Sequence, residues 1–214
     1  MNKMEKWDVK KDVVTVDRLN FYARDLRVLK GIRDYSDFYN RVNKIRKIFD
    51  FDKKIVIDVF DDLQELENLL ETKVPKWVIG TSFNNAILIL DYDKWKTSNN
   101  ETVENLILHE FIHVVLSLKS KTNLPAWLNE GLAVYFSDQY HSFKNQNFDN
   151  KININFYEVD YSHGNIYFIS MCVLIKLIDK YGIEKVIHEA LNTKDFEKSV
   201  IFNNENLLKV INSK

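Results

Sequence analysis

The fold prediction starts from the stretch NLILHEFIHVVLSL, residues 105–118. Its apolar residues indicate a buried helix, whereas its two histidines and one glutamate are unfavourable in such a helix. Leu, Ile, Val and Phe surround almost the whole helical circumference, which is typical of a buried helix. His109, Glu110 and His113 interrupt them, and such side chains are costly to bury without partners. Residues four apart share one helix face, so the two histidines can face a single point. A metal ion at that point would explain the pattern.

The motif HEFIH (109–113) has the spacing of two metal ligands and one base. Zinc binds neutral imidazole nitrogens and commonly completes a catalytic site with a carboxylate and a water molecule. Glu110 projects about 100° around the helix from His109, so it can reach the water without binding the metal. The alternative is a pair of buried, hydrogen-bonded histidines, which the apolar surroundings disfavour.

The third ligand must come from outside this helix. Glu130 in PAWLNEGLAVYF (125–136) is the best candidate, since the connector KSKTNLP can turn the chain and send a second helix back beside the first. Pro125 suits the first turn of that helix. Four other side chains are rival candidates: Asp138, His141, Glu158 and His163.

The pattern along the whole chain predicts an α+β fold: an N-terminal mixed β-sheet with helices, the HExxH helix, and a helical C-terminal lobe. Runs of β-branched residues predict strands at 13–16, 54–60, 76–80 and 86–90, with TSFNN as the turn between the last two. Helical spacing predicts helices at 32–49, 61–71, about 99–119, 125–140 and 166–182, and one or two short helices after them. The expected N-terminal caps are Asp61 or Asp62 for the second helix and Asn99, Asn100 or Thr102 for the third. Gly182 is expected to end the fifth. Residues 141–160 are expected to be mainly loop. We expect residues 1–97 and 98–214 to be two parts of one compact catalytic unit.

Composition limits the partners and the compartment. The 214 residues carry a formal net charge of -1, so there is no cationic surplus for nucleic acid. No apolar run reaches the roughly 18 residues of a membrane span, and the polar start MNKMEKWDVKKDVV lacks the core of a signal peptide. The single cysteine, Cys172, fits a reducing compartment. We therefore expect a cytoplasmic protein without membrane partners; the sequence leaves its oligomeric state open.

The segment HEFIH followed by LPAWLNEGLAVYF resembles the gluzincin branch of zinc metallopeptidases, most closely small bacterial peptidase MA-like domains. The resemblance is strongest over about residues 98–140, and weaker over the strands WVIG and AILIL and over residues 164–186. It implies a zincin-like fold, with His109, His113 and Glu130 as the zinc ligands and Glu110 as the general base.

The resemblance also implies a hydrogen-bond donor to the oxyanion and a place for the substrate. Tyr167 occupies the position of that donor, with Tyr161 and His163 as alternatives. A peptide or protein substrate is expected to add as an extra strand to residues 86–90, as the edge of the sheet beside the metal.

Two departures from the family's pattern matter. The segment GTSFNN (80–85) lacks the glutamate that grips a free amine in aminopeptidases, which favours an endopeptidase. Val134 stands where thermolysin-like enzymes carry an acid that supports a histidine ligand, so that support must come from elsewhere.

The sequence therefore predicts a zinc-dependent peptidase that hydrolyses a peptide bond through metal-activated water. Its main rival is a zinc-binding interaction or regulatory module on a peptidase-like fold, without hydrolysis. Glu110 separates the two, because a non-hydrolytic module has no need of an acid beside an open coordination position. A third hypothesis, a metal-free helical interaction protein, is tested by measuring the metal content.

Overall fold

The structure is a computed structural model, and it describes residues 11–76, 78–91, 93, 102–143, 151–159, 161 and 166–213. Its contacts divide the chain into unit 1 (Met1–Phe38 and Asp52–Ile107) and unit 2 (Tyr39–Phe51 and Leu108–Lys214). The divisions fall within two helices, α1 (Tyr35–Phe49) and α4 (Val103–Lys119). The boundary predicted between residues 97 and 98 lies outside the described residues.

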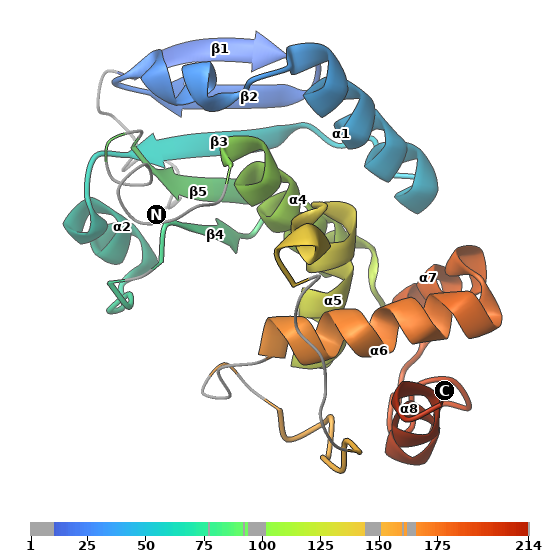
Figure 1. Cartoon of the computed structure of the whole chain (residues 1–214). Helices are drawn as coiled ribbons and strands as arrows, with labels where there is room; N and C mark the ends of the chain where they lie inside the picture. Colours follow the sequence, from blue (N-terminus) through green and yellow to red (C-terminus); the bar gives the residue numbers. More distant parts are fainter. Residues whose placement is uncertain are drawn as a thin grey trace. The chain divides into compact units, whose positions relative to one another are not determined.

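Unit 1 contains a five-stranded mixed sheet, which confirms the predicted α+β class. Strands β2, β3 and β5 run parallel to their neighbours in that set, whereas β1 and β4 pair antiparallel at the two sides (Figure 1). The spatial order is β1-β2-β3-β5-β4. The strand bounds are Asp12–Val16 for β1, Leu19–Ala23 for β2, Ile55–Phe60 for β3, Gly80–Phe83 for β4 and Ala86–Leu90 for β5.

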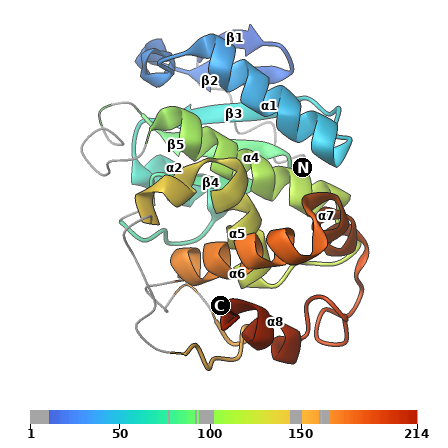
Figure 2. The same cartoon turned by 45° about the vertical axis from the view of Figure 1, so that its right-hand side comes forward.

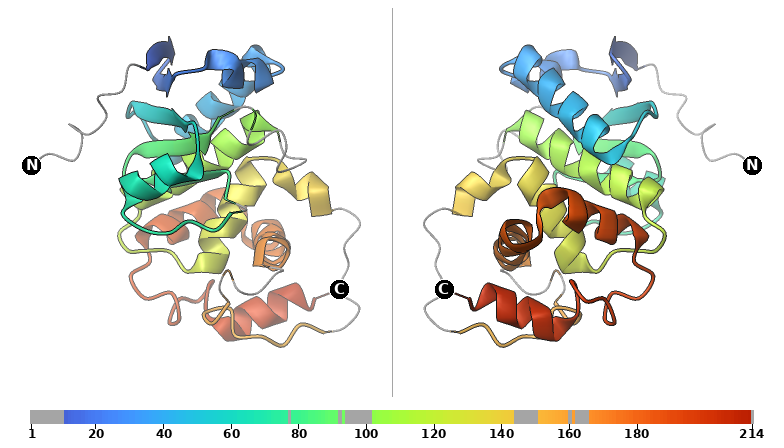
Figure 3. Two further views of the ribbon diagram at one scale, coloured as in Figure 1. Left: turned by 90° about the vertical axis from the view of Figure 1, so that its left-hand side faces the viewer. Right: turned by 90° about the vertical axis from the view of Figure 1, so that its right-hand side faces the viewer.

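Two central strands of this sheet, β3 and β5, are buried because their runs of apolar side chains supply both faces. Helix α2 (Leu63–Leu70) packs on one face of the sheet (Figure 3). Leu66 of this helix belongs to one buried apolar cluster with Phe60 and Leu88. The helix begins as predicted, since the side chain of Asp62 accepts a hydrogen bond from the Glu65 amide at 2.9 Å.

Two strand predictions need correction. The strand expected at 76–80 is wrong: the Val78 amide bonds locally to the Pro75 carbonyl at 2.9 Å, and β4 begins only at Gly80. The expectation that residues 86–90 form the sheet edge is also wrong, because β5 lies between β3 and β4. Strand β4, which pairs with β5, is an edge strand of this sheet, as is β1 on the opposite side. The sequence pattern also missed β2 and a short 3-10 helix, η2 (Leu26–Gly31).

Unit 2 is helical, as predicted for the C-terminal part. Helix α5 (Ala126–Phe136) lies against α6 (Ile166–Tyr181), and a Cβ added at Gly131 would be only 2.9 Å from the Ser170 carbonyl oxygen (Figure 2). Two short helices follow, α7 (Ile183–Asn192) and α8 (Asn204–Ile211), which confirms the prediction for the chain's end. No helix in the described ranges has both the length and the apolar character needed to cross a membrane.

Individual residues determine where several helices begin and end. Gly182 ends α6 with φ 81°, as predicted. Thr102 caps α4, its hydroxyl accepting from the Asn105 amide at 3.2 Å; the rival caps, Asn99 and Asn100, lie outside the described residues. The helix predicted to reach residue 140 ends earlier, at Phe136, because Asp138 adopts the left-handed conformation with φ 61°. A 3-10 helix, η3 (Gln139–Phe143), follows that turn.

The loop predicted at 141–160 is wrong at residues 141–143, which belong to the 3-10 helix η3, but it is confirmed at residues 151–159. Asparagine side chains tie this extended segment to α8. The Asn212 amide group bonds both the N–H and the carbonyl of Ile152, at 2.9 and 2.8 Å, and Asn204 accepts from the Phe156 amide at 2.8 Å. The hydrogen bonds replace a strand partner, which explains how an irregular segment is held in place.

Candidate metal centre

Helices α4 and α5 bring three predicted metal ligands together within unit 2. His109, His113 and Glu130 each offer a ligand atom, and these atoms all lie within 4.8 Å of one another. Nε2 of His109 is 3.3 Å from Oε2 of Glu130, and Nε2 of His113 is 3.6 Å from Oε1 of the same carboxylate. The carboxylate is only 2% exposed. The arrangement is a buried cluster of two imidazoles and one acid.

Local sequence explains the arrangement. The i, i+4 spacing places both histidine rings on one face of α4, with ring centroids 4.7 Å apart. Pro125 precedes α5, and its carbonyl accepts hydrogen bonds from the Leu128 and Asn129 amides, both at 3.0 Å. The helix therefore starts at Ala126, four residues before Glu130, and the small Gly131 lets the backbone of α6 approach closely behind it.

The hydrogen bonds of His109 determine which ring nitrogen carries the proton. Its Nδ1 lies 2.6 Å from Oε1 of Gln139, and that oxygen also accepts a hydrogen bond from the Ser137 hydroxyl at 3.1 Å. Nδ1 is therefore the donor, and in the neutral ring the lone pair of Nε2 faces Glu130. Oε2 of Glu130 and Nδ1 of His113 are buried without a hydrogen-bond partner in the described part of the chain.

Electrostatics within the cluster stabilise opposite charges. Burial alone would raise the pKa of Glu130, but hydrogen bonds and charge from His109, His113 and Tyr161 outweigh it, so the pKa is lowered. Burial would lower the pKa of His109, but Glu130, Glu110 and Gln139 outweigh it, so that pKa is raised. The acid favours its anion, and the imidazole beside it favours a bound cation or proton.

The donor set fits a divalent metal. Two ligand atoms bound tetrahedrally at about 2.0–2.1 Å from zinc lie roughly 3.4 Å apart. The two nitrogen–oxygen separations here, 3.3 and 3.6 Å, bracket that spacing before any metal is added. Two imidazoles and one carboxylate are also the protein ligands of many catalytic zinc sites. The two separations involve different oxygens of Glu130, and the grouped ligand atoms lie within 4.8 Å of one another, so the three side chains could hold such an ion.

Glu110, the predicted base, lies beside the cluster without being one of its three grouped ligands. Its side chain belongs to a residue that is 7% exposed. Its charge raises the pKa of His109, Tyr161 and Tyr167, so the carboxylate acts electrostatically on the same small volume. Because Glu110 is next to His109 in the sequence, the site contains a second acid in addition to Glu130. This second acid is not required as a metal ligand.

Two tyrosines reach the cluster, and they are used differently. The Tyr161 hydroxyl donates a hydrogen bond to Oε1 of Glu130 at 2.7 Å. The Tyr167 ring centroid lies 6.2 Å from that of His109, and its hydroxyl has no hydrogen-bond partner among the described residues. Burial, Glu130 and Glu110 raise the pKa of Tyr167 to about 12, so its hydroxyl remains protonated at neutral pH. Tyr167 can therefore donate a hydrogen bond to a ligand.

The rival third ligands lie elsewhere or outside the described residues. Asp138 is 3.6 Å from Arg41, the His141 ring stacks on Tyr140 with centroids 4.0 Å apart, and Glu158 accepts a hydrogen bond from Asn155 at 3.0 Å. None of these three belongs to the grouped ligands of the described chain. His163 lies outside the described residues.

Sequence reasoning missed one member of the site, Gln139. Thermolysin-like enzymes support a histidine ligand with an acid at the position of Val134. Here the side-chain carbonyl oxygen of Gln139 takes this supporting role through its hydrogen bond with the His109 ring. The available signal was the pair Ser137-Asp138, since both residue types favour helix ends. Reading the helix through residue 140 hid the turn that brings Gln139 back to α4.

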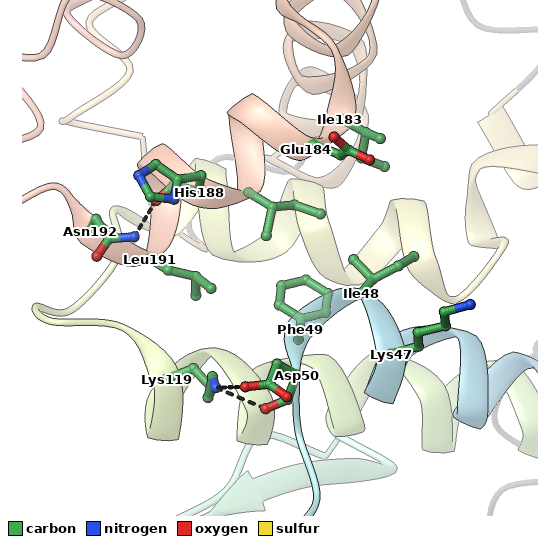
Figure 4. Close-up of a pocket in the computed structure, with 11 residues that line it drawn as sticks. Lys47, Ile48, Phe49, Asp50, Lys119, Ile183, Glu184, His188, Leu191 and Asn192 are labelled. Atoms are coloured by element: carbon green, nitrogen blue, oxygen red, sulfur yellow. Dashed lines mark hydrogen bonds and ion pairs between the residues drawn. The ribbon is translucent and has the colours of Figure 1, made fainter.

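Unit 2 also has a cavity of about 670 Å³ that contains none of the predicted site residues (Figure 4). Its apolar lining includes Phe49 and Ile187. Lys119 and Asp50 also line it, and the Lys119 ammonium donates a hydrogen bond to the Asp50 carbonyl at 2.8 Å. His188 lines it, but among the described residues this histidine belongs to no group of three metal-ligating side chains. We assign no chemistry to this cavity.

Comparisons with protein-family models, curated proteins and solved structures found no match to this chain. A functional conclusion therefore depends on the motif residues and on the geometry described above.

Proposed function

We propose that this chain is a zinc-dependent peptidase of the gluzincin type with a zincin-like fold, and that it cleaves peptide bonds as an endopeptidase. The observation that carries the proposal is the facing pair of acceptors in the buried cluster. With Nδ1 of His109 bonded to Gln139, the lone pair of Nε2 faces Oε2 of Glu130 at 3.3 Å. Two acceptors in contact need a cation or a proton between them.

His109, His113 and Glu130 would hold the ion, which when bound acidifies a water molecule and polarises a carbonyl group. Glu110 is the general base in this proposal: its carboxylate takes the proton of the attacking water and delivers it to the leaving amine. Tyr167 donates its free hydroxyl hydrogen bond to the developing oxyanion. The hydrogen bond between Tyr161 and Glu130 orients the carboxylate ligand.

The proposed substrate is a peptide that binds as an added strand. Strand β4 pairs with β5 and is one of the two edge strands of the sheet, so in this proposal the role passes from residues 86–90 to residues 80–83. Phe83 is 36% exposed on this edge, and an exposed ring offers a peptide side chain an apolar contact. The absence of an acid in GTSFNN (80–85) supports cleavage within a chain over removal of a terminal residue.

The decisive test is Glu110→Gln. We expect the variant to bind zinc with the wild-type stoichiometry and to cleave a diverse peptide library about 10²–10⁴ times more slowly, because an amide cannot accept the proton of the water. Glu104→Gln is the matched control, since Glu104 is also a buried glutamate (8% exposed) and lies six residues earlier on α4. It should leave cleavage unchanged.

Equal cleavage by Glu110→Gln and wild type would overturn the role of the base. Stoichiometric zinc with no chelator-sensitive cleavage by the wild type would instead favour the non-hydrolytic zinc-binding module. A protein that binds no divalent metal would end both.

A further inference from the structure

The most constrained part of the site is the acceptor behind His109. Oε1 of Gln139 lies 2.6 Å from Nδ1 of the ring and accepts a second hydrogen bond, from the Ser137 hydroxyl, at 3.1 Å. The Ser137 residue is fully buried, at 0% exposed. A carbonyl oxygen that receives two donors has its lone pairs used, so its direction is fixed.

The turn that presents Gln139 is itself held from outside. Helix α5 ends at Phe136, and Asp138 takes the left-handed conformation, which reverses the chain. A guanidinium nitrogen of Arg41 donates to the Ser137 carbonyl at 2.7 Å and lies near the Asp138 carboxylate. This turn costs free energy for a non-glycine residue, and the arginine and serine contacts offset that cost.

We propose that Gln139 is a positioning residue for the metal centre: it keeps the proton on Nδ1 of His109, aims the Nε2 lone pair at the metal, and does so with a neutral group. The inference rests on the proposed metal binding and adds to it. His113 makes the contrast within the site, since its Nδ1 is buried without a partner among the described residues. Among the described residues, one histidine of the proposed metal site has a hydrogen bond at Nδ1 and the other does not.

The neutrality of the amide has a chemical consequence. A carboxylate behind a histidine ligand adds negative charge and raises the basicity of the imidazole. An amide oxygen orients the ring but adds no charge, so His109 donates less electron density to a bound cation. The metal then binds less tightly than it would with an acid behind the ring, and it keeps more positive charge for polarising its other ligands.

The experiment compares Gln139→Met, Gln139→Glu and the control Gln64→Met, which changes an exposed glutamine on α2. Zinc affinity is measured at constant pH by competition with a chelator. The Nδ1–H of His109 is observed in metal-free protein by nitrogen-15 NMR and assigned through its loss in His109→Ala. We expect Gln139→Met to bind zinc about 10–100 times more weakly and to lose the Nδ1–H signal. We expect Gln139→Glu to keep that signal and to bind zinc more tightly than wild type.

Each outcome bears on one claim. Unchanged zinc affinity and a retained Nδ1–H in folded Gln139→Met would overturn the positioning role while leaving the metal site intact. If the wild type binds no zinc, the proposed function fails, and the NMR signal still tests whether Gln139 fixes the ring. If Gln139→Met does not fold, Gln139→Glu decides, because weaker zinc binding by that variant contradicts the inference.

Discussion

The most deeply buried carboxylates of the two units, among the described residues, have different kinds of partner. Asp58 on β3 and Glu130 on α5 are both only 2% exposed. The Lys11 ammonium donates to Asp58 at 2.7 Å and lies 4.2 Å from the centroid of the Phe60 ring. Glu130 instead meets two imidazoles and the Tyr161 hydroxyl.

The partners explain what each acid can do. Lys11 carries a permanent charge, so the pair with Asp58 is complete in the folded chain and needs nothing from solution. An imidazole is neutral unless it gains a proton, so the cluster around Glu130 is complete only when a cation or a proton arrives. Burial raises the pKa of Asp58 despite Lys11, whereas the partners of Glu130 lower its pKa despite burial. A buried acid therefore indicates a site only when its partners leave electron pairs unsatisfied.

The largest expected effect is on the stabilisation of the protein by zinc, compared between Glu130→Gln and Asp58→Asn. Zinc at about 1,000 times its dissociation constant should stabilise the wild type by about 4.1 kcal/mol. Removing a ligand should weaken binding by at least about 100-fold, which reduces this stabilisation at the same free zinc to about 1.4 kcal/mol. Asp58→Asn should keep the full increment, although its own stability falls. Thermal unfolding with and without zinc measures both, and an undiminished increment in Glu130→Gln would remove this residue from the ligand set.

A smaller effect should separate the packing of the two regions. A Cβ at Gly131 would lie 2.9 Å from the Ser170 backbone oxygen, whereas at Gly80 it would lie 3.0 Å from the terminal methyl group of Leu106. A backbone atom moves only with its helix, but a leucine side chain can turn away. Gly131→Ala should therefore cost about 1–3 kcal/mol, and Gly80→Ala clearly less.

Chemical denaturation of the two glycine variants measures this difference. Zinc affinity of the same two variants gives a second measurement. Gly131 is next to the proposed ligand Glu130, so a displacement of α5 in Gly131→Ala should weaken metal binding. Equal stability losses at the two glycines would mean that α5 and α6 can separate as easily as a side chain rotates.

The sequence was most informative where a residue's chemistry is expressed within one helix. His109, His113 and Glu110 follow from the spacing on α4 alone, and the connector length was enough to place Glu130 on the next helix. The class of the fold and strands β3 and β5 were also predictable, because buried strands are runs of apolar side chains.

The parts that could not be predicted depend on contacts between distant segments. The order of strands put β4 outside β5, and no local pattern encodes that choice. Gln139 acts through a turn whose left-handed residue, Asp138, is stabilised by Arg41 nearly a hundred positions earlier. Tyr161 approaches Glu130 from a loop tied to α8, so its role could be proposed but not distinguished from that of Tyr167.

The smallest effect tests the completed pair directly, through the pH dependence of stability. The raised pKa of Asp58 means that the folded state holds its proton more tightly than the unfolded chain does. Stability attributable to this group is then greatest at low pH and falls as the pH rises from about 3.8 through the raised pKa. The free energy of unfolding of the wild type relative to Asp58→Asn should decline over that window. Asp195→Asn is the control, since a hydrogen bond from Lys198 lowers the pKa of Asp195 and the wild type should gain relative stability as the pH rises toward 3.8. A flat curve for Asp58→Asn would show that Lys11 fully compensates the burial of Asp58, and the contrast between the two buried acids would then rest on Glu130 alone.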